Sequence, residues 1–153
     1  MFSSKIVEMI CNWLNNKFMV VYRADALQLV RKFSDPKKKS AYVERTLNKA
    51  AKYFGINSNA IGYVVDGDDT EARLCSIFDI DEKNSTAIPA EIFESYGTIR
   101  FINLFPLVVR ALMTGSTLIV DEFDASVHPM ALMNIINIFH NDEINTKKAQ
   151  LIF

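Results

Sequence analysis

A short apolar run that ends in two acidic residues constrains the fold of this chain more than any other feature. Residues 117–120 read Thr-Leu-Ile-Val, follow Gly115 and Ser116, and are followed by Asp121 and Glu122. Because the run is short, β-branched and bounded by turn residues, it predicts a buried parallel strand. Open α/β sheets bind ligands at the carboxyl ends of their strands, so the two acids are expected at a binding edge.

The adjacent carboxylates of this pair suit a particular chemistry. Two neighbouring carboxylates repel each other unless a cation or a proton intervenes. Asp121 suits Mg²⁺, usually held through water, and Glu122 suits orienting or deprotonating an attacking water molecule. The alternative is that acids simply end many strands, and the pair by itself does not decide between the two interpretations.

A Ser-x-Gly-Thr turn at residues 95–98 precedes a long apolar segment. Ser95 and Thr98 are good helix N-cap residues, Gly97 lets a backbone approach a ligand closely, and residues 99–113 are mostly apolar. A helix N-terminus presents free N–H groups and is an anion site. The alternative is an ordinary capped helix without a ligand.

A polar loop follows the acidic pair. Residues 124–129 read Asp-Ala-Ser-Val-His-Pro, and Pro129 fits the first position of a helix. The loop is either functional or a plain strand-to-helix connection, in which His128 is a structural cap.

Together and in this order, the three features resemble the second half of an ABC-type ATPase domain of the OLD/RecF/SMC-like group of prokaryotic defence and DNA-maintenance systems. The sequence ESYGT stands at the signature motif, LIVDE at Walker B, DASVH at the D-loop, and KKAQLIF at the strand before the switch histidine. The resemblance covers about residues 91–153. The chain has no G-x-x-x-x-G-K-[ST] motif, so no P-loop is assigned, and it is expected to be a piece of a longer protein.

The resemblance also implies a site. Two such domains dimerise head to tail, and each ATP lies between the P-loop of one and the signature of the other. Asp121 would then hold Mg²⁺, and Glu122 would be the catalytic carboxylate. The residues expected to contact ATP or to communicate across the dimer are Ser95, Gly97, Thr98, Asp124, Ser126 and His128.

The function implied by the resemblance is ATP hydrolysis by a homodimer, in a complete protein of which this chain alone is inactive. Further expected partners are an effector nuclease or toxin subunit and DNA, but no membrane. Two alternatives stay open. The first is a non-hydrolytic interaction module that keeps the acidic pair as structure. The second is a RecF/SMC-like DNA-repair clamp.

Composition bounds these expectations. The chain has 153 residues, half of them hydrophobic, which is enough for a real core. The net charge of −1 argues against a whole-domain polyanion binder. Two cysteines form neither a metal motif nor a disulfide framework, so a reduced, cytoplasmic setting is expected. No apolar run reaches about 18 residues, and the amino terminus does not read as a signal peptide.

The predicted fold class is α/β, a partial ABC-type ATPase domain with parallel strands. Residues 1–90 are expected to form a helical and β-hairpin lobe, and residues 91–153 the signature and Walker B half. Helical periodicity predicts an amino-terminal helix with Trp13 in the core. The other elements predicted from periodicity and turn residues are helices at 23–33, 37–54, 99–113 and 130–140, and strands at 18–22, 61–65, 72–80 and 149–153.

Overall fold

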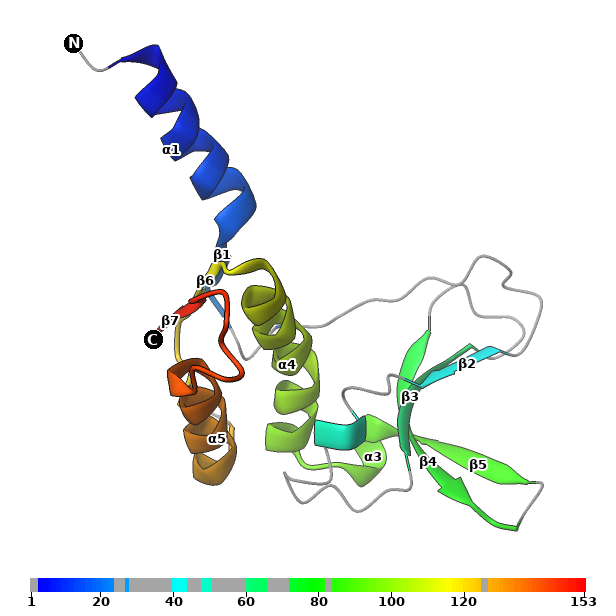
Figure 1. Ribbon diagram of the computed structural model, residues 1–153. Coiled ribbons are helices and arrows are strands. Elements are labelled where there is room, and N and C mark those ends of the chain that lie inside the picture. Colours follow the sequence, from blue (N-terminus) through cyan, green and yellow to red (C-terminus); the bar gives the residue numbers. More distant parts are fainter. Residues whose placement is uncertain are drawn as a thin grey trace. The chain divides into compact units, whose positions relative to one another are not determined.

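The chain is described by a computed structural model, shown in Figure 1, over residues 3–23, 27, 40–43, 48–50, 60–65, 72–81, 84–124 and 127–153. It divides into two compact units. One comprises residues 1–27 and 104–153, and the other residues 28–103. The two units are described separately below. The proposed division into a lobe at 1–90 and an ATPase half at 91–153 stays a prediction.

The first unit contains a parallel three-stranded sheet. Its strands are β1 (Phe18–Val21), β6 (Thr117–Val120) and β7 (Gln150–Ile152), in the order β1-β6-β7. Both pairs are parallel, and the central strand β6 is almost completely buried. The buried strand predicted at 117–120 and the final strand beside it are therefore confirmed, and so is the α/β fold class.

Helix α5 (Pro129–His140) follows the loop after β6. Pro129 occupies the first helical position, where its missing N–H costs nothing. Ala131, Ile135 and Phe139 recur every four residues and are buried, which gives the helix one apolar face. The helix predicted at 130–140 is confirmed.

Helix α4 (Tyr96–Thr114) is longer and carries Pro106 in its interior. Among the described helices it is long and apolar enough to cross a membrane, with a mean hydropathy of 1.2. Core helices of proteins meet the same criterion, and Leu104, Val108 and Ala111 are buried within the first unit. A single helix of this kind is therefore weak evidence for a membrane span.

The second unit contains an antiparallel sheet with the order β2-β3-β4-β5. Its strands are β2 (Ser40–Val43), β3 (Ala60–Val65), β4 (Arg73–Asp79) and β5 (Ser85–Pro89), and the short helix α3 (Ala90–Phe93) follows them. The antiparallel pairing of β3 with β4 confirms the predicted hairpin. Its predicted turn at 66–69 lies outside the described residues.

Two predicted helices need correction or lie mostly outside the described residues. The helix predicted at 37–54 is wrong at its start, because Ser40–Val43 is strand β2 and pairs with β3. Sheet pairing there overrides a helical pattern of apolar residues, and Tyr42 and Val43 favour strands in any case. Residues 48–50 are helical. Most of the helix predicted at 23–33 lies outside the described residues.

The amino-terminal helix is α1 (Ser4–Lys17), as predicted, but it has no buried residue. Trp13 is 44 % exposed, so its predicted place in the core is wrong. Its ring lies 5.3 Å from that of Phe18, at the start of β1. Amphipathic periodicity indicates which side of a helix is apolar but not what covers it.

Both cysteines are free, which agrees with the sequence analysis. Cys11 is exposed on α1, whereas Cys75 is buried on β4. Burial raises the pKa of the Cys75 thiol, and the nearby positive charge of Arg73 opposes that rise in part. The buried thiol therefore stays protonated and behaves as a small apolar group.

Gly115 ends α4 in a conformation that other residues rarely adopt. Its φ is +63°, and the N–H of Ser116 reaches back to the carbonyl of Ala111 at 3.0 Å. A Cβ added at this position would lie 2.7 Å from the backbone oxygen of Lys147. The end of α4 and the segment before β7 thus meet at a point that only glycine fits.

We expect Gly115→Ala to lower the free energy of unfolding by about 2 kcal/mol or more, because it adds both left-handed strain and a backbone clash. Urea denaturation measures the change. Met113→Ala is the matched control, since Met113 is 66 % exposed on the same helix end. The control should change stability by about 0.5 kcal/mol or less. Equal effects of the two variants would contradict the role of Gly115.

Candidate functional site

The acidic pair lies at the carboxyl end of β6, as the sequence predicts. The N–H of Asp121 donates to the carbonyl of Val21 at 2.9 Å, so the ladder with β1 continues one residue beyond the strand. The Asp121 Oδ1 atom accepts the N–H of Glu122 at 3.0 Å. Both side chains are exposed. Asp121 is therefore held by the sheet, while the carboxylates face solvent.

Glu122 has an unusual backbone conformation. Its φ is +54°, in the left-handed region that non-glycine residues avoid. Such strain persists where the surroundings impose it, and it is concentrated at functional sites. The conformation turns the chain sharply after Asp121, a feature that the sequence did not reveal.

Phe123 anchors the loop between two exposed acids. It is 3 % exposed, and its ring lies 5.2 Å from that of Phe153 at the end of β7. Asp124, on its other side, is exposed. The sequence analysis missed Phe123, although an apolar residue among acids is the signal that could have identified it.

The rest of this loop leads into α5. His128 caps the helix, with its Nδ1 accepting the N–H of Met130 at 3.2 Å and its carbonyl accepting the N–H of Ala131 at 2.8 Å. The interpretation of His128 as a structural cap is thus the one the structure supports. Ser126 lies outside the described residues. Asp121, Glu122, Asp124 and His128 are brought together on one segment.

The second cluster is the turn that opens α4, in the unit formed by residues 28–103. The Oγ atom of Ser95 accepts the N–H of Thr98 at 3.2 Å and lies 2.9 Å from the Oγ1 of Thr98. Ser95 is therefore the helix N-cap that the sequence predicts. Gly97 stands in the first turn, where N–H groups point out of the helix. The turn has the form of an anion site.

One hydrogen bond at this turn had no sequence signal. Ser76 on β4 is fully buried, and its hydroxyl donates to the Glu94 carboxylate at 2.7 Å. Glu94 directly precedes Ser95. Ser76 and Glu94 are 18 positions apart in the sequence, and the fold brings them together.

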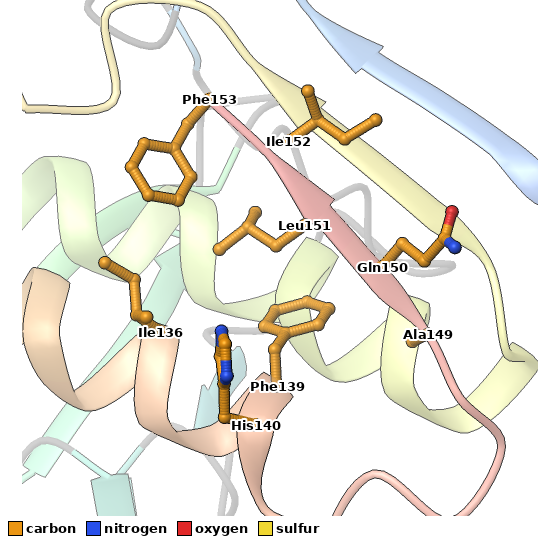
Figure 2. A pocket seen from close by; sticks show the side chains of 8 residues that line it. All are labelled: Ile136, Phe139, His140, Ala149, Gln150, Leu151, Ile152 and Phe153. Carbon is orange, nitrogen blue, oxygen red and sulfur yellow. The ribbon is translucent and has the colours of Figure 1, made fainter.

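A separate pocket of about 420 Å³ lies between β7 and α5 and contains none of the predicted site residues. Figure 2 shows Leu151 and Phe153 pointing toward Ile136 and Phe139 of α5, whereas Gln150 and Ile152 lie on the other side of the strand. His140 is the titratable residue among those that line it. Most of the lining residues are apolar, and one of them, Phe153, contacts Phe123 of the acidic loop.

Comparison with known protein families matches residues 12–153 to the model described as "AAA domain, putative AbiEii toxin, Type IV TA system". The chain belongs to this AAA-domain family. No curated protein and no solved structure matches the chain. The parallel sheet with its helices agrees with a P-loop ATPase-like domain, and membership of the AAA-domain family indicates a nucleotide-binding, ATPase-like function.

The residues of this AAA domain suit an Mg²⁺ ion held by one or two carboxylates. Among the residues that the structure describes, no group of three or more His, Cys, Asp or Glu side chains could hold a metal ion. Mg²⁺ in nucleotide enzymes needs only one or two carboxylates, because waters and phosphates complete its shell. Asp121, an exposed carboxylate on a fixed backbone, fits that requirement.

The strain at Glu122 predicts that glycine is more stable than alanine at this position, the reverse of the order in a helix interior. Glu122→Gly should be more stable to urea than Glu122→Ala by about 1 kcal/mol, because glycine adopts a φ of +54° freely. Arg110 is the matched control, an exposed residue in the interior of α4. There the alanine variant should be the more stable by about 1 kcal/mol. The same order of stability at both positions would show that Glu122 is not strained.

Proposed function

We propose that the chain is part of an ATP-hydrolysing ABC-type ATPase of the OLD/RecF/SMC-like group, working in the cytoplasm. The observation that carries the proposal is the acidic pair at the carboxyl end of β6, with Asp121 fixed by the sheet and Glu122 in a strained conformation. Membership of the AAA-domain family supports a nucleotide as the ligand.

The division of labour between the two acids follows from their surroundings. Asp121, whose backbone is held by Val21, would hold Mg²⁺ through one carboxylate. Mg²⁺, when bound, would offset the negative charge that develops on the phosphate groups. Glu122 would accept a proton from the attacking water or orient it, since it is exposed directly after the residue that would hold the metal ion.

The turn at the start of α4 would serve a second nucleotide. In this proposal, Ser95, Gly97 and Thr98 meet the γ-phosphate of an ATP held mainly by another subunit, in a head-to-tail homodimer. The helix N-terminus supports this role, because its dipole and outward N–H groups favour negative charge. The N–H of Thr98 already donates to the Ser95 hydroxyl. Asp124, Ser126 and His128 would lie at the dimer contact, His128 with its Nδ1 already used as a cap.

The phosphate-binding loop of the nucleotide's own subunit must come from elsewhere, because this sequence has no G-x-x-x-x-G-K-[ST] motif. The family description names a putative toxin and a type IV toxin–antitoxin system, and this favours a role related to toxin–antitoxin systems. In this proposal the system is a prokaryotic defence system, and the effector is a nuclease or toxin subunit. DNA is a further candidate partner, and a DNA-repair clamp a related alternative. We propose no membrane association.

A second candidate function is a non-hydrolytic interaction module. The exposed apolar side of α1 favours it, since six large apolar side chains there are between 44 % and 67 % exposed. These residues are Ile6, Val7, Met9, Ile10, Trp13 and Leu14. In this alternative the acidic pair is only structural, so the two functions differ in what Glu122 does.

Glu122→Gln in the complete protein decides between them. The substitution keeps the shape of the side chain and removes the base, so hydrolysis should slow by roughly 10²-fold or more while ATP binding persists. Steady-state phosphate release and a nucleotide-binding titration measure the two quantities. Glu143→Gln, at an exposed acid after α5, is the control and should hydrolyse normally. Turnover of Glu122→Gln near the wild-type rate would leave the interaction module as the better explanation.

Ser95→Arg tests the arrangement across the dimer. A bulky cation at the N-cap should block closure on a partner's phosphate while leaving ATP binding to the subunit's own loop nearly intact. We expect ATP-dependent dimers, measured by light scattering in the Glu122→Gln background, to disappear. Ser95→Thr keeps the capping hydroxyl and is the control. Undiminished dimers in Ser95→Arg would reduce the turn to an ordinary helix start.

A further inference from the structure

Glu94, the residue just before the α4 turn, has a carboxylate that the fold holds in place. Glu94 is part-buried, and its Oε1 accepts the hydroxyl of Ser76 at 2.7 Å. Ser76 is 0 % exposed, so its hydroxyl needs a partner inside the protein. A hydroxyl that donates to a carboxylate makes a charge-assisted bond, stronger than one between neutral groups. The carboxylate of Glu94 is therefore held against β4.

The anchor on β4 is itself rigid. Ser76 pairs with Ile61 of β3 on one side and with Ile88 of β5 on the other. Ile61 is fixed further by Asn48, whose side chain bonds its N–H at 2.6 Å and its carbonyl at 2.8 Å. A continuous row of contacts thus crosses the sheet from Asn48 to Glu94. Ser76 has little freedom to follow Glu94 if that residue moves.

The backbone at Glu94 is also fixed from the side of α3. Its N–H donates to the carbonyl of Ala90 at 2.7 Å, and its own φ and ψ of −91° and 153° are extended. Phe93 packs edge-on against Phe78 of β4, with 4.6 Å between the ring centroids. Glu94 therefore leaves α3 at a defined point and passes directly to the N-cap Ser95.

A carboxylate next to an anion site can compete with the anion for the same N–H groups. The N-terminus of α4 carries roughly half a positive charge and outward N–H groups, which attract any nearby negative group. A free Glu94 side chain could satisfy those N–H groups and compete with a phosphate for them. Its bond to Ser76 offers the charge another partner, on the sheet.

We propose that Ser76 is a positioning residue for the phosphate-facing turn. It holds the Glu94 carboxylate on β4, and so keeps the first turn of α4 open to the γ-phosphate of a partner-bound nucleotide. The proposal rests on the proposed function of the Ser95–Thr98 turn, and it adds a residue from a different strand to that site.

The first arm of the test measures activity in the complete protein. Ser76→Ala should lower kcat for ATP hydrolysis roughly tenfold and leave KM unchanged, because the affected contact forms only on closure with the partner. Ser85→Ala is the matched control, since Ser85 also donates to a carboxylate of the same sheet, that of Asp79, at 2.8 Å. The control should keep the wild-type kcat. Equal rates in the two variants would overturn the proposal.

The second arm separates positioning from mere support of the fold. Glu94→Gln keeps an oxygen that accepts the Ser76 hydroxyl and removes the negative charge. The double variant Ser76→Ala/Glu94→Gln should recover most of the activity lost in Ser76→Ala, because the amide carries no charge to compete with phosphate. A double variant as slow as Ser76→Ala would show a structural role only and would overturn the proposal.

The third arm does not depend on hydrolysis. In the chain alone, amide hydrogen exchange reports the N–H groups of Thr98 and Ile99, which bond Ser95. Ser76→Ala should change exchange at these two amides by roughly tenfold, while Ser85→Ala and the double variant Ser76→Ala/Glu94→Gln should not. Unchanged exchange in Ser76→Ala would overturn the anchoring. If Glu122→Gln hydrolyses ATP at the wild-type rate, the proposed function is refuted. The exchange measurement still tests the anchoring, because it does not depend on hydrolysis.

Discussion

The pairing of β6 between two parallel neighbours is the constraint on which the candidate catalytic loop depends. Because β6 is bonded to β1 on one side and β7 on the other, its carboxyl end cannot shift along the sheet. The ladder extends to the N–H of Asp121, and the chain turns at once through the left-handed Glu122. Phe123 then fills a buried position against Phe153. Sheet, strained residue and buried ring together hold the backbone that carries the two carboxylates.

The first unit could be predicted well because its signals are local. The strand Thr117–Val120 matched its predicted bounds, and α5 and β7 matched theirs to within a residue, since apolar runs, Pro129 and turn residues mark them in the sequence. Gly115 was recognised as the end of α4 for the same reason. The place of Asp121 and Glu122 was predictable for the same reason, because they directly follow the strand, while their roles stay predictions.

The second unit was harder because its structure depends on distant partners. Tyr42 and Val43 fit a helical stripe as well as a strand, and only β3 decides between them. The bond between Ser76 and Glu94 joins two polar residues that no periodicity connects. The environment of Trp13 could not be predicted either, because an amphipathic pattern does not say whether its apolar side is covered. These failures share one cause, which is that nonlocal contacts leave no local pattern.

The distance in sequence between β1 and β6 has a consequence for how the chain is made. Phe18 pairs with Thr117, and the Lys17 ammonium group donates to the carbonyl of Thr114. During synthesis, β1 therefore stays unpaired until a partner about a hundred residues later has been made. At ribosomal speeds of roughly 5–20 residues per second, that wait lasts about 5–20 s. The antiparallel unit, complete by Asn103, emerges first and can fold during this interval. The parallel sheet that carries the two acids is thus assembled last, and a nascent chain exposes the apolar side of α1 together with an unpaired β1 until Val120 has left the ribosome.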